Sequence, residues 1–143
     1  MRFFRSSNET KFMLFEAFVL LAWGRILKSV PFSKLAPKLG NRMRETSYEP
    51  VEEHHKLLRE ISHVVYLASK YTFWESECLV KALAARQMLK RRGIESTLYL
   101  GTGRDEQRKL IAHAWLRSGP YIVTGSEGME QFTMVAAFAN FHT

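Results

Sequence analysis

Residues 74–93, with the sequence WESECLVKALAARQMLKRRG, predict the helix around which the rest of the chain is organised. Leu79, Leu83 and Met88 recur at the spacing of one buried helical face. The run ends in Arg-Arg-Gly, which suits a helix end because cations favour the negative end of the helix dipole and glycine favours a left-handed cap. A short polar turn precedes Cys78, so we expect the helix to begin at that residue.

Cys78 is the only cysteine in the chain, and its predicted place is the first turn of this helix. Unpaired backbone N–H groups and the positive end of the helix dipole favour a thiolate there. The same donors, the N–H of Cys78 first among them, suit the oxyanion that forms when a sulfur attacks a carbonyl. A lone cysteine is more often a small buried apolar residue, so the assignment depends on its setting.

Downstream of this helix, short apolar runs alternate with turn residues, which predicts an antiparallel sheet and an α+β domain. The expected strands are 96–101, 110–117, 121–124 and 132–138, with a hairpin loop at 104–108 and a tight turn at Ser118-Gly119. His113 falls on the second of these strands and offers a general base to Cys78. A cysteine at a helix start followed by a histidine on a later strand is the order found in papain-like and transglutaminase-like thiol enzymes.

Upstream, residues 9–28 predict a helix with a broad apolar circumference, which implies burial on several sides or a docking surface. Its apolar run is shorter than the roughly 20 residues that span a bilayer, and it contains Glu16. Contact with the core or a partner is therefore favoured over attachment to a membrane surface. Residues 31–50 are basic and predict a solvated linker, with a basic strip for an acidic partner as the alternative. A further helix is expected over 52–70, and its histidines are assigned to structural or surface positions.

The composition bounds the class of protein. At 143 residues the chain fits one domain, in which residues 1–50 form a helical extension and 51–143 hold the cysteine and the histidine. One cysteine forms no internal disulfide, which fits a reducing, cytoplasmic setting. No Cys/His cluster has zinc-ligand spacing and no glycine-rich phosphate loop occurs, so we expect neither metal nor cofactor. The formal net charge of +7 suggests acidic partners without separating nucleic acid, membrane and acidic protein.

The string ECLVKALAARQMLKRRGIESTLYLG, followed by AHAWLRSGPYIVTG, resembles the leader peptidases of lasso-peptide biosynthesis, small relatives of the transglutaminase-like cysteine proteases. The resemblance covers about residues 55–138. Its carriers are Cys78 opening the helix, Arg92-Gly93-Ile94 closing it, the strand 96–101 and the strand with His113-Ala114-Trp115. It implies N-terminal helices packed on an antiparallel β-sheet around a transglutaminase- or papain-like core.

The same resemblance implies a cysteine endopeptidase that removes the leader from a ribosomally made lasso precursor. Cys78 would be the nucleophile, and His113 the general base and later the general acid. Three partners are implied: a separate small leader-binding recognition protein, the lasso precursor peptide, and an ATP-dependent lasso macrocyclase that receives the freed core peptide. Nucleic acid is not expected among them. A transglutaminase-like acyl transferase and a non-catalytic peptide-binding module on the same fold are the alternatives.

The sequence departs from this family in the third catalytic member, which is usually an aspartate on the strand after the histidine. The only aspartate, Asp105, precedes His113 in the polar loop. If the Ser-Gly turn has two residues, the hairpin register places Thr124 opposite His113 on one sheet face. Glu127 is the nearest carboxylate that follows. Thr124 and Glu127 are therefore equal candidates for orienting the imidazole.

Overall fold

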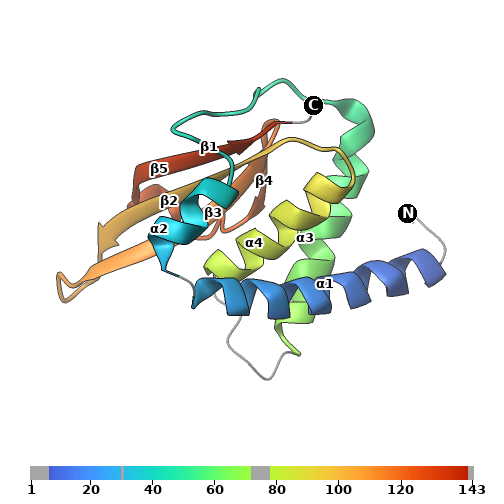
Figure 1. Ribbon diagram of the computed structural model, residues 1–143, viewed down its shortest axis with the longest axis horizontal. Coiled ribbons are helices and arrows are strands. Elements are labelled where there is room, and N and C mark those ends of the chain that lie inside the picture. The colour runs from blue at the N-terminus through green and yellow to red at the C-terminus, as the bar shows by residue number, and fades with distance from the viewer. Residues whose placement is uncertain (1–6, 30, 72–77, 142–143) are drawn as a thin grey trace.

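The computed structural model describes residues 7–29, 31–71 and 78–141, in which helices stack on one face of an antiparallel sheet (Figure 1). This confirms the α+β class expected from the sequence. The elements follow in the order α1 (Ser7–Lys28), α2 (Phe32–Leu35), β1 (Asn41–Arg42), α3 (His55–Ser69), α4 (Cys78–Arg91), β2 (Ser96–Arg104), β3 (Leu110–Ser118), β4 (Tyr121–Thr124) and β5 (Thr133–Asn140). Short 3-10 turns lie at Ala36–Lys38, Glu52–His54 and Met129–Gln131.

The sheet has the strand order β1-β5-β2-β3-β4, and each neighbouring pair is antiparallel. The long strand β2 lies at the centre because it pairs with β3 on one side and β5 on the other. β3 pairs with β4 only over residues 116–118. Within the described ranges, the first half of β3 therefore has no strand on that side and forms an edge of the sheet.

The turn between β3 and β4 differs by one residue from the predicted one. Ser118 pairs with Tyr121, which makes Gly119 and Pro120 the turn residues in place of Ser118 and Gly119. Gly119 takes a positive φ of +58°, which a tight turn of this kind requires and glycine adopts without strain. The observed turn keeps Pro120, which lacks an N–H, out of the hydrogen-bonded ladder.

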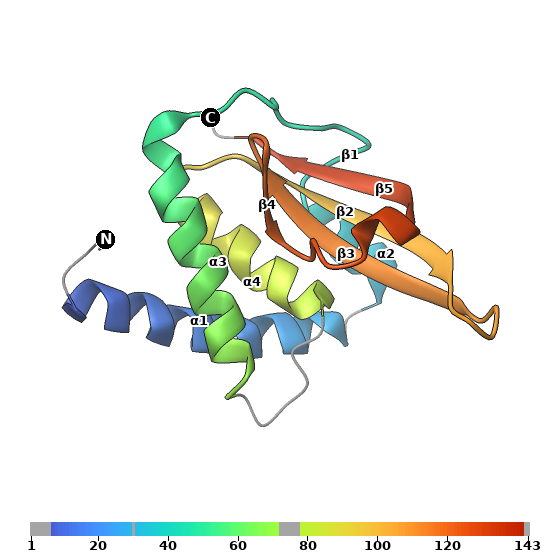
Figure 2. The ribbon, with the colours of Figure 1, turned by 180° about the vertical axis from the view of Figure 1, so that it is seen from behind.

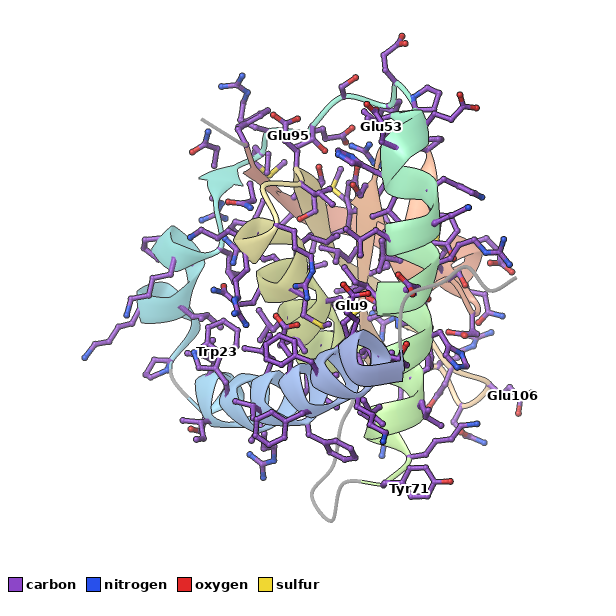
Figure 3. The ribbon with its side chains drawn as sticks, turned by 90° about the vertical axis from the view of Figure 1, so that its right-hand side faces the viewer. Glu9, Trp23, Glu53, Tyr71, Glu95 and Glu106 are labelled. Atoms are coloured by element: carbon purple, nitrogen blue, oxygen red, sulfur yellow. The ribbon has the colours of Figure 1, made fainter. Side chains whose placement is uncertain are left out.

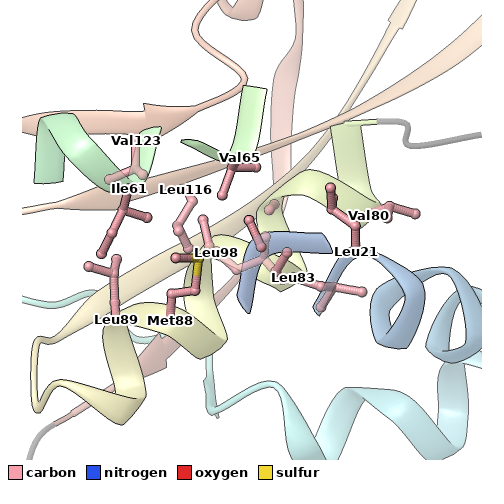
Figure 4. Packing of buried hydrophobic residues seen from close by; sticks show 14 of the residues in the cluster. Leu21, Ile61, Val65, Val80, Leu83, Met88, Leu89, Leu98, Leu116 and Val123 are labelled. Atoms are coloured by element: carbon pink, nitrogen blue, oxygen red, sulfur yellow. The ribbon is translucent and has the colours of Figure 1, made fainter. Parts of the chain in front are cut away.

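The main hydrophobic core lies between the helices and the inner face of the sheet (Figure 4). Because α4 is covered by the sheet on one side and by α1 and α3 on the other, it is buried nearly all round. α4 contributes Val80, Leu83, Met88 and Leu89 to this core, and the strands contribute Leu98, Leu116 and Val123. The apolar repeat that predicted this helix therefore marks real core positions.

α1 belongs to the same core and crosses α3 near the end of α3 that carries Tyr71 (Figure 3). Met13, Ala17 and Leu21 are buried on its inner side. On its outer side four large apolar side chains are exposed over about half of their surface or more: Phe12, Phe15, Val19 and Ile26. Their spacing of three, four and seven residues places them on one helical face, which we call the α1 stripe.

Glu16 lies within the apolar surface of α1, where its carboxylate forms a buried ion cluster with two arginines at the end of α4. Its side chain is 3% exposed, and its carboxylate oxygens lie 2.7 Å from Arg91 Nη1 and 2.6 Å from Arg92 Nη2. Arg92 also donates to the carbonyl of Met88 at 2.9 Å. The charge that sequence analysis found inside an apolar run thus connects α1 to the last turn of α4.

The outer face of the sheet carries a second, smaller cluster of Tyr99, Trp115 and Ala137, with Phe132 packed against it. Arg117 lies on the same face, where its guanidinium sits 3.5 Å from the ring centroid of Tyr48 and donates to the hydroxyl of Tyr99 at 2.9 Å. The same guanidinium donates to the carbonyls of Thr46, Ser47 and Gly119. These bonds fasten the segment before α3 to the outer face.

Candidate active site

Cys78 is the first residue of α4, as the sequence predicted, and its side chain is half-buried against the main core. The end of α4 that carries it approaches β3, as both ribbon views show (Figure 2). Trp74 and Glu77, which precede Cys78 in the sequence, lie outside the described residues. The thiol is therefore neither sealed inside the core nor fully exposed, which leaves it open to a substrate at a helix N-terminus.

His113 lies in the edge half of β3, opposite Gly101 of β2. Its imidazole stacks between two aromatic rings, with centroid distances of 5.7 Å to Trp115 and 4.8 Å to Phe132. Trp115 belongs to the outer cluster, and Ala114, the residue between the two, belongs to the helix-side core. The alternation of a strand therefore directs His113 to the sheet face opposite α4.

Within the described part of the chain, the ring of His113 has one hydrogen-bond partner, the main-chain carbonyl of Gly125, which lies 2.7 Å from Nε2. A carbonyl oxygen only accepts hydrogen bonds, so Nε2 must carry the proton in this contact. Nδ1 then holds the lone pair and is the nitrogen that can act as a base. The contact thus selects one tautomer, which is the task of the third member in a catalytic triad.

Gly125 follows β4 directly and has a φ of +81°, in the left-handed region that favours glycine. A side chain at this position would collide with the carbonyl of Ala114 and with Trp115, so the chain turns against β3 here without room for a Cβ. The N–H of Gly125 donates to the hydroxyl of Tyr66 at 3.3 Å. Gly125 therefore contacts β3 and α3 at once.

Tyr66, on α3, lies between the candidate nucleophile and the loop after β4. Its hydroxyl donates to the carboxylate of Glu127, whose oxygens lie 2.9 and 3.1 Å away. The ammonium of Lys81, from the first turn of α4, lies 4.5 Å from the centroid of its ring. Burial raises the pKa of Tyr66 above 10.0; the hydrogen bond from the Gly125 N–H lowers this pKa, whereas Glu127 and the nearby Cys78 raise it. This influence indicates that Cys78 and the Tyr66 hydroxyl share one electrostatic neighbourhood.

The four residues predicted for the site therefore gather around one loop without forming a single contact network. No hydrogen bond joins Cys78 to His113 among the residues described; Gly125 donates its N–H to Tyr66 and accepts at its carbonyl from His113. In this arrangement the thiol and the imidazole approach the loop from the two sides of the sheet edge.

The two candidates for the third member occupy other positions. Thr124 lies opposite Leu116 and not opposite His113, so the predicted register is wrong. Both the different turn residues and an irregularity between Leu116 and Arg117 change the pairing. The Thr124 hydroxyl is buried and has no hydrogen-bond partner among the residues that the structure describes. Glu127 binds Tyr66 and not the imidazole. A main-chain carbonyl takes the place expected for both side chains.

Sequence analysis missed Tyr66, Gly125 and Phe132, the residues that surround His113 and its loop. A main-chain acceptor cannot be recognised from the sequence, because every residue has a carbonyl. Tyr66 is an ordinary aromatic residue on a half-buried helix, and nothing in the sequence distinguishes it. The one available signal was Gly125 itself, because a glycine directly after a strand indicates a tight turn or a close backbone approach.

Other kinds of site are not indicated in the parts of the chain that the structure covers. No group of three or more His, Cys, Asp or Glu side chains there lies close enough to hold a metal ion. None of the described helices has the length and hydropathy to cross a membrane. A hollow of about 990 Å³ lies between residues 46–58, 93–95 and 118–121. It adjoins the C-terminal end of α4, opposite the end that carries Cys78.

One comparison with known proteins identifies a family. A family model described as the transglutaminase-like superfamily matches residues 17–137, which include both Cys78 and His113. The chain matches none of the curated proteins and none of the solved structures with which it was compared. The helices packed on an antiparallel sheet fit the transglutaminase- or papain-like core expected from the sequence.

Proposed function

The chain belongs to the transglutaminase-like superfamily, which includes cysteine proteases and acyl transferases, and from this premise we propose that it is a cysteine endopeptidase. Its proposed task is to remove the leader peptide from a ribosomally made lasso precursor. Cys78 is the proposed nucleophile and His113 the proposed general base and acid. The observation that carries the assignment is the contact between His113 Nε2 and the Gly125 carbonyl at 2.7 Å, because it leaves Nδ1 as the basic nitrogen.

The proposed reaction proceeds in two steps. His113 Nδ1 takes the proton of the Cys78 thiol, and the thiolate attacks the carbonyl at the leader–core junction. The imidazolium then gives its proton to the amine of the core peptide, which leaves, and a thioester joins the leader to Cys78. Water, deprotonated by the same imidazole, hydrolyses this thioester and frees the leader and the thiol.

One feature of the structure supports this chemistry, and one general property of enzymes bears on it. Backbone N–H groups at the start of α4 are suited to the oxyanion that forms in each step. Catalytic hydrogen bonds are often long or absent before substrate binds and form only in the complex. The proposal therefore requires substrate binding to bring the imidazole of His113 within reach of the thiol.

The partners expected from the resemblance form part of the proposal: a leader-binding recognition protein, the precursor, and an ATP-dependent macrocyclase. The α1 stripe supports the presence of a protein partner, because Phe12, Phe15, Val19 and Ile26 expose between 49% and 67% of their surface. An aligned apolar surface of this kind marks interaction sites more often than scattered residues do. We assign the stripe to docking of the recognition protein or the macrocyclase.

The test is cleavage of a lasso precursor in the presence of its recognition protein, followed by mass spectrometry of the products. The proposal predicts one cut at the leader–core junction by the wild type and none by Cys78→Ala or His113→Ala. His63→Ala, a change at an exposed histidine of α3, is the matched control and should retain cleavage. Transfer of the leader to an added amine in preference to water would identify an acyl transferase. Binding of the precursor without any reaction would identify a peptide-binding module.

A further inference from the structure

We infer that Tyr66 is a positioning residue for His113: it holds the main chain of Gly125, whose carbonyl fixes the imidazole. The effect of Tyr66 on the tautomer of His113 can be tested without any enzymatic activity. Its catalytic consequence rests on the proposed function.

Gly125 connects the side chains of Tyr66 and His113 directly. Its N–H donates to the Tyr66 hydroxyl at 3.3 Å, and its carbonyl accepts from His113 Nε2 at 2.7 Å. Both contacts are made by one residue, so a displacement of its N–H changes the position of its carbonyl as well. An acceptor displaced by about 1 Å loses most of a hydrogen bond.

Tyr66 supports the loop that begins at Gly125, in addition to the close packing of Gly125 against β3. Gly125 and Gly128, which bound it, take φ values of +81° and +71°, and a Cβ at Gly128 would have no atom within 4 Å. Ser126 and Glu127 between them are exposed. The Tyr66 hydroxyl contacts this loop at Gly125 and again at Glu127, and so fastens it to α3 at two points.

The Tyr66 hydroxyl must accept a hydrogen bond from Gly125 and donate one to Glu127 simultaneously. Only a neutral hydroxyl does both. The hydroxyl is protonated at neutral pH because a tyrosine has an ordinary pKa of about 10, and burial raises the pKa of Tyr66 further. Lys81 holds the ring from the other side, with its ammonium 4.5 Å from the ring centroid.

This arrangement gives Glu127 an indirect role. Sequence analysis placed it beside His113, and the structure places it one hydrogen bond further away, as the acceptor that orients the Tyr66 hydroxyl. Removal of its carboxylate leaves the Tyr66–Gly125 contact possible. Removal of the Tyr66 hydroxyl eliminates both contacts with the loop.

The experiment is ¹⁵N NMR of the imidazole nitrogens in wild type, Tyr66→Phe, Glu127→Ala and the control Tyr71→Phe, which alters an exposed tyrosine just after α3. The His113 signals are assigned by their absence from His113→Gln. Wild type and Tyr71→Phe are expected to show the Nε2–H tautomer alone. Tyr66→Phe should shift both nitrogens toward the averaged values of a free imidazole, and Glu127→Ala should shift them less.

An unchanged single tautomer in folded Tyr66→Phe overturns the inference. A larger shift in Glu127→Ala than in Tyr66→Phe also overturns it, because the carboxylate would then act on His113 without Tyr66. If Tyr66→Phe does not fold, Glu127→Ala decides alone: a partial shift supports the inference and no shift contradicts it.

The activity readout separates this inference from the proposed function. In the cleavage assay, Tyr66→Phe is expected to lower kcat about tenfold with KM unchanged, because orientation of the base is lost while peptide contacts remain. Cys78→Ala abolishes cleavage and should keep the single tautomer. A protein that cleaves nothing but shows the predicted tautomer shift would refute the function and retain the positioning role.

Discussion

Gly125 packs closely against β3 and also supplies the carbonyl that binds His113, so both the fold and the candidate site depend on it. Its φ of +81° excludes most side chains, and a Cβ there would collide with the carbonyl of Ala114. Gly125→Ala is expected to lower the free energy of unfolding by about 1 to 3 kcal/mol, measured by urea denaturation. Gly128→Ala is the matched control, because it shares the positive φ but has open space around the added methyl.

The two glycine variants separate steric collision from backbone preference. Gly128→Ala should cost only about 1 kcal/mol, since backbone conformation alone is affected. Equal losses of stability in both variants would show that Gly125 does not pack closely against β3.

Tyr99 predicts a dependence of stability on alkaline pH. Burial, and next the hydrogen bond with Tyr48, raise the pKa of Tyr99 above 10.0. Above about pH 10 the unfolded chain therefore loses this proton before the folded protein does, and stability falls as the pH rises further. Tyr99→Phe should show a shallower fall above pH 10 than wild type in urea denaturation at several pH values. An identical slope would argue against this role, and exposed Tyr71→Phe should leave the slope unchanged.

At the residue scale, the sequence indicated candidate reactive side chains but no group that acts through the main chain. Cys78 opens α4 as expected, because helix ends have composition signals that a single sequence displays. Gly125 was missed as a partner of His113, since any residue can supply a carbonyl. The same limit explains why Thr124 and Glu127 were proposed for a task that a carbonyl performs.

At the scale of elements, Glu16 is the main electrostatic link between α1 and α4. Removing one member of a buried ion cluster leaves its partners without compensation, although Arg91 is half exposed and can be solvated. Glu16→Ala is therefore expected to lower the free energy of unfolding by about 2 to 4 kcal/mol, measured by urea denaturation. Glu106→Ala, at an exposed glutamate of the β2–β3 loop, is the control. Equal unfolding midpoints for the two variants would contradict the role of the cluster.

The elements were easier to predict than their pairing. α1, α3, α4 and the strands β2 to β5 occupy nearly the ranges that periodicity predicted, because burial of one face leaves a repeat in the sequence. The register of β3 and β4 was wrong, since it depended on one turn and on a shift between Leu116 and Arg117 that no repeat reveals. β1 was not predicted, because Asn41–Arg42 is too short to show any pattern.

At the scale of the whole molecule, α1 has two functions that must be tested separately. Its inner side supplies Met13, Ala17 and Leu21 to the core, so deletion of α1 would unfold the protein and reveal nothing about docking. Substitution of the outer stripe alone avoids this problem. Phe12→Ser with Phe15→Ser should weaken capture of the recognition protein or the macrocyclase at least about tenfold in a pull-down, without loss of thermal stability.

The control for this prediction is Val51→Ser, which changes an exposed apolar residue before α3, away from the stripe. Unchanged capture of both proteins by the Phe12/Phe15 double variant would exclude the α1 stripe as their docking surface. Which of the two proteins loses binding identifies the occupant.

The proposed chemistry as a whole is tested most directly by intact-protein mass spectrometry of the enzyme, acid-quenched during turnover of a lasso precursor with its recognition protein. Because Cys78 is the only cysteine, a thioester adduct reports on it without ambiguity. We predict an adduct with the mass of the leader acyl group on the wild type, and none on Cys78→Ala or His113→Ala. Cleavage of the precursor by Cys78→Ala, or an adduct of equal amount on His113→Ala, would contradict the assignment of nucleophile and base.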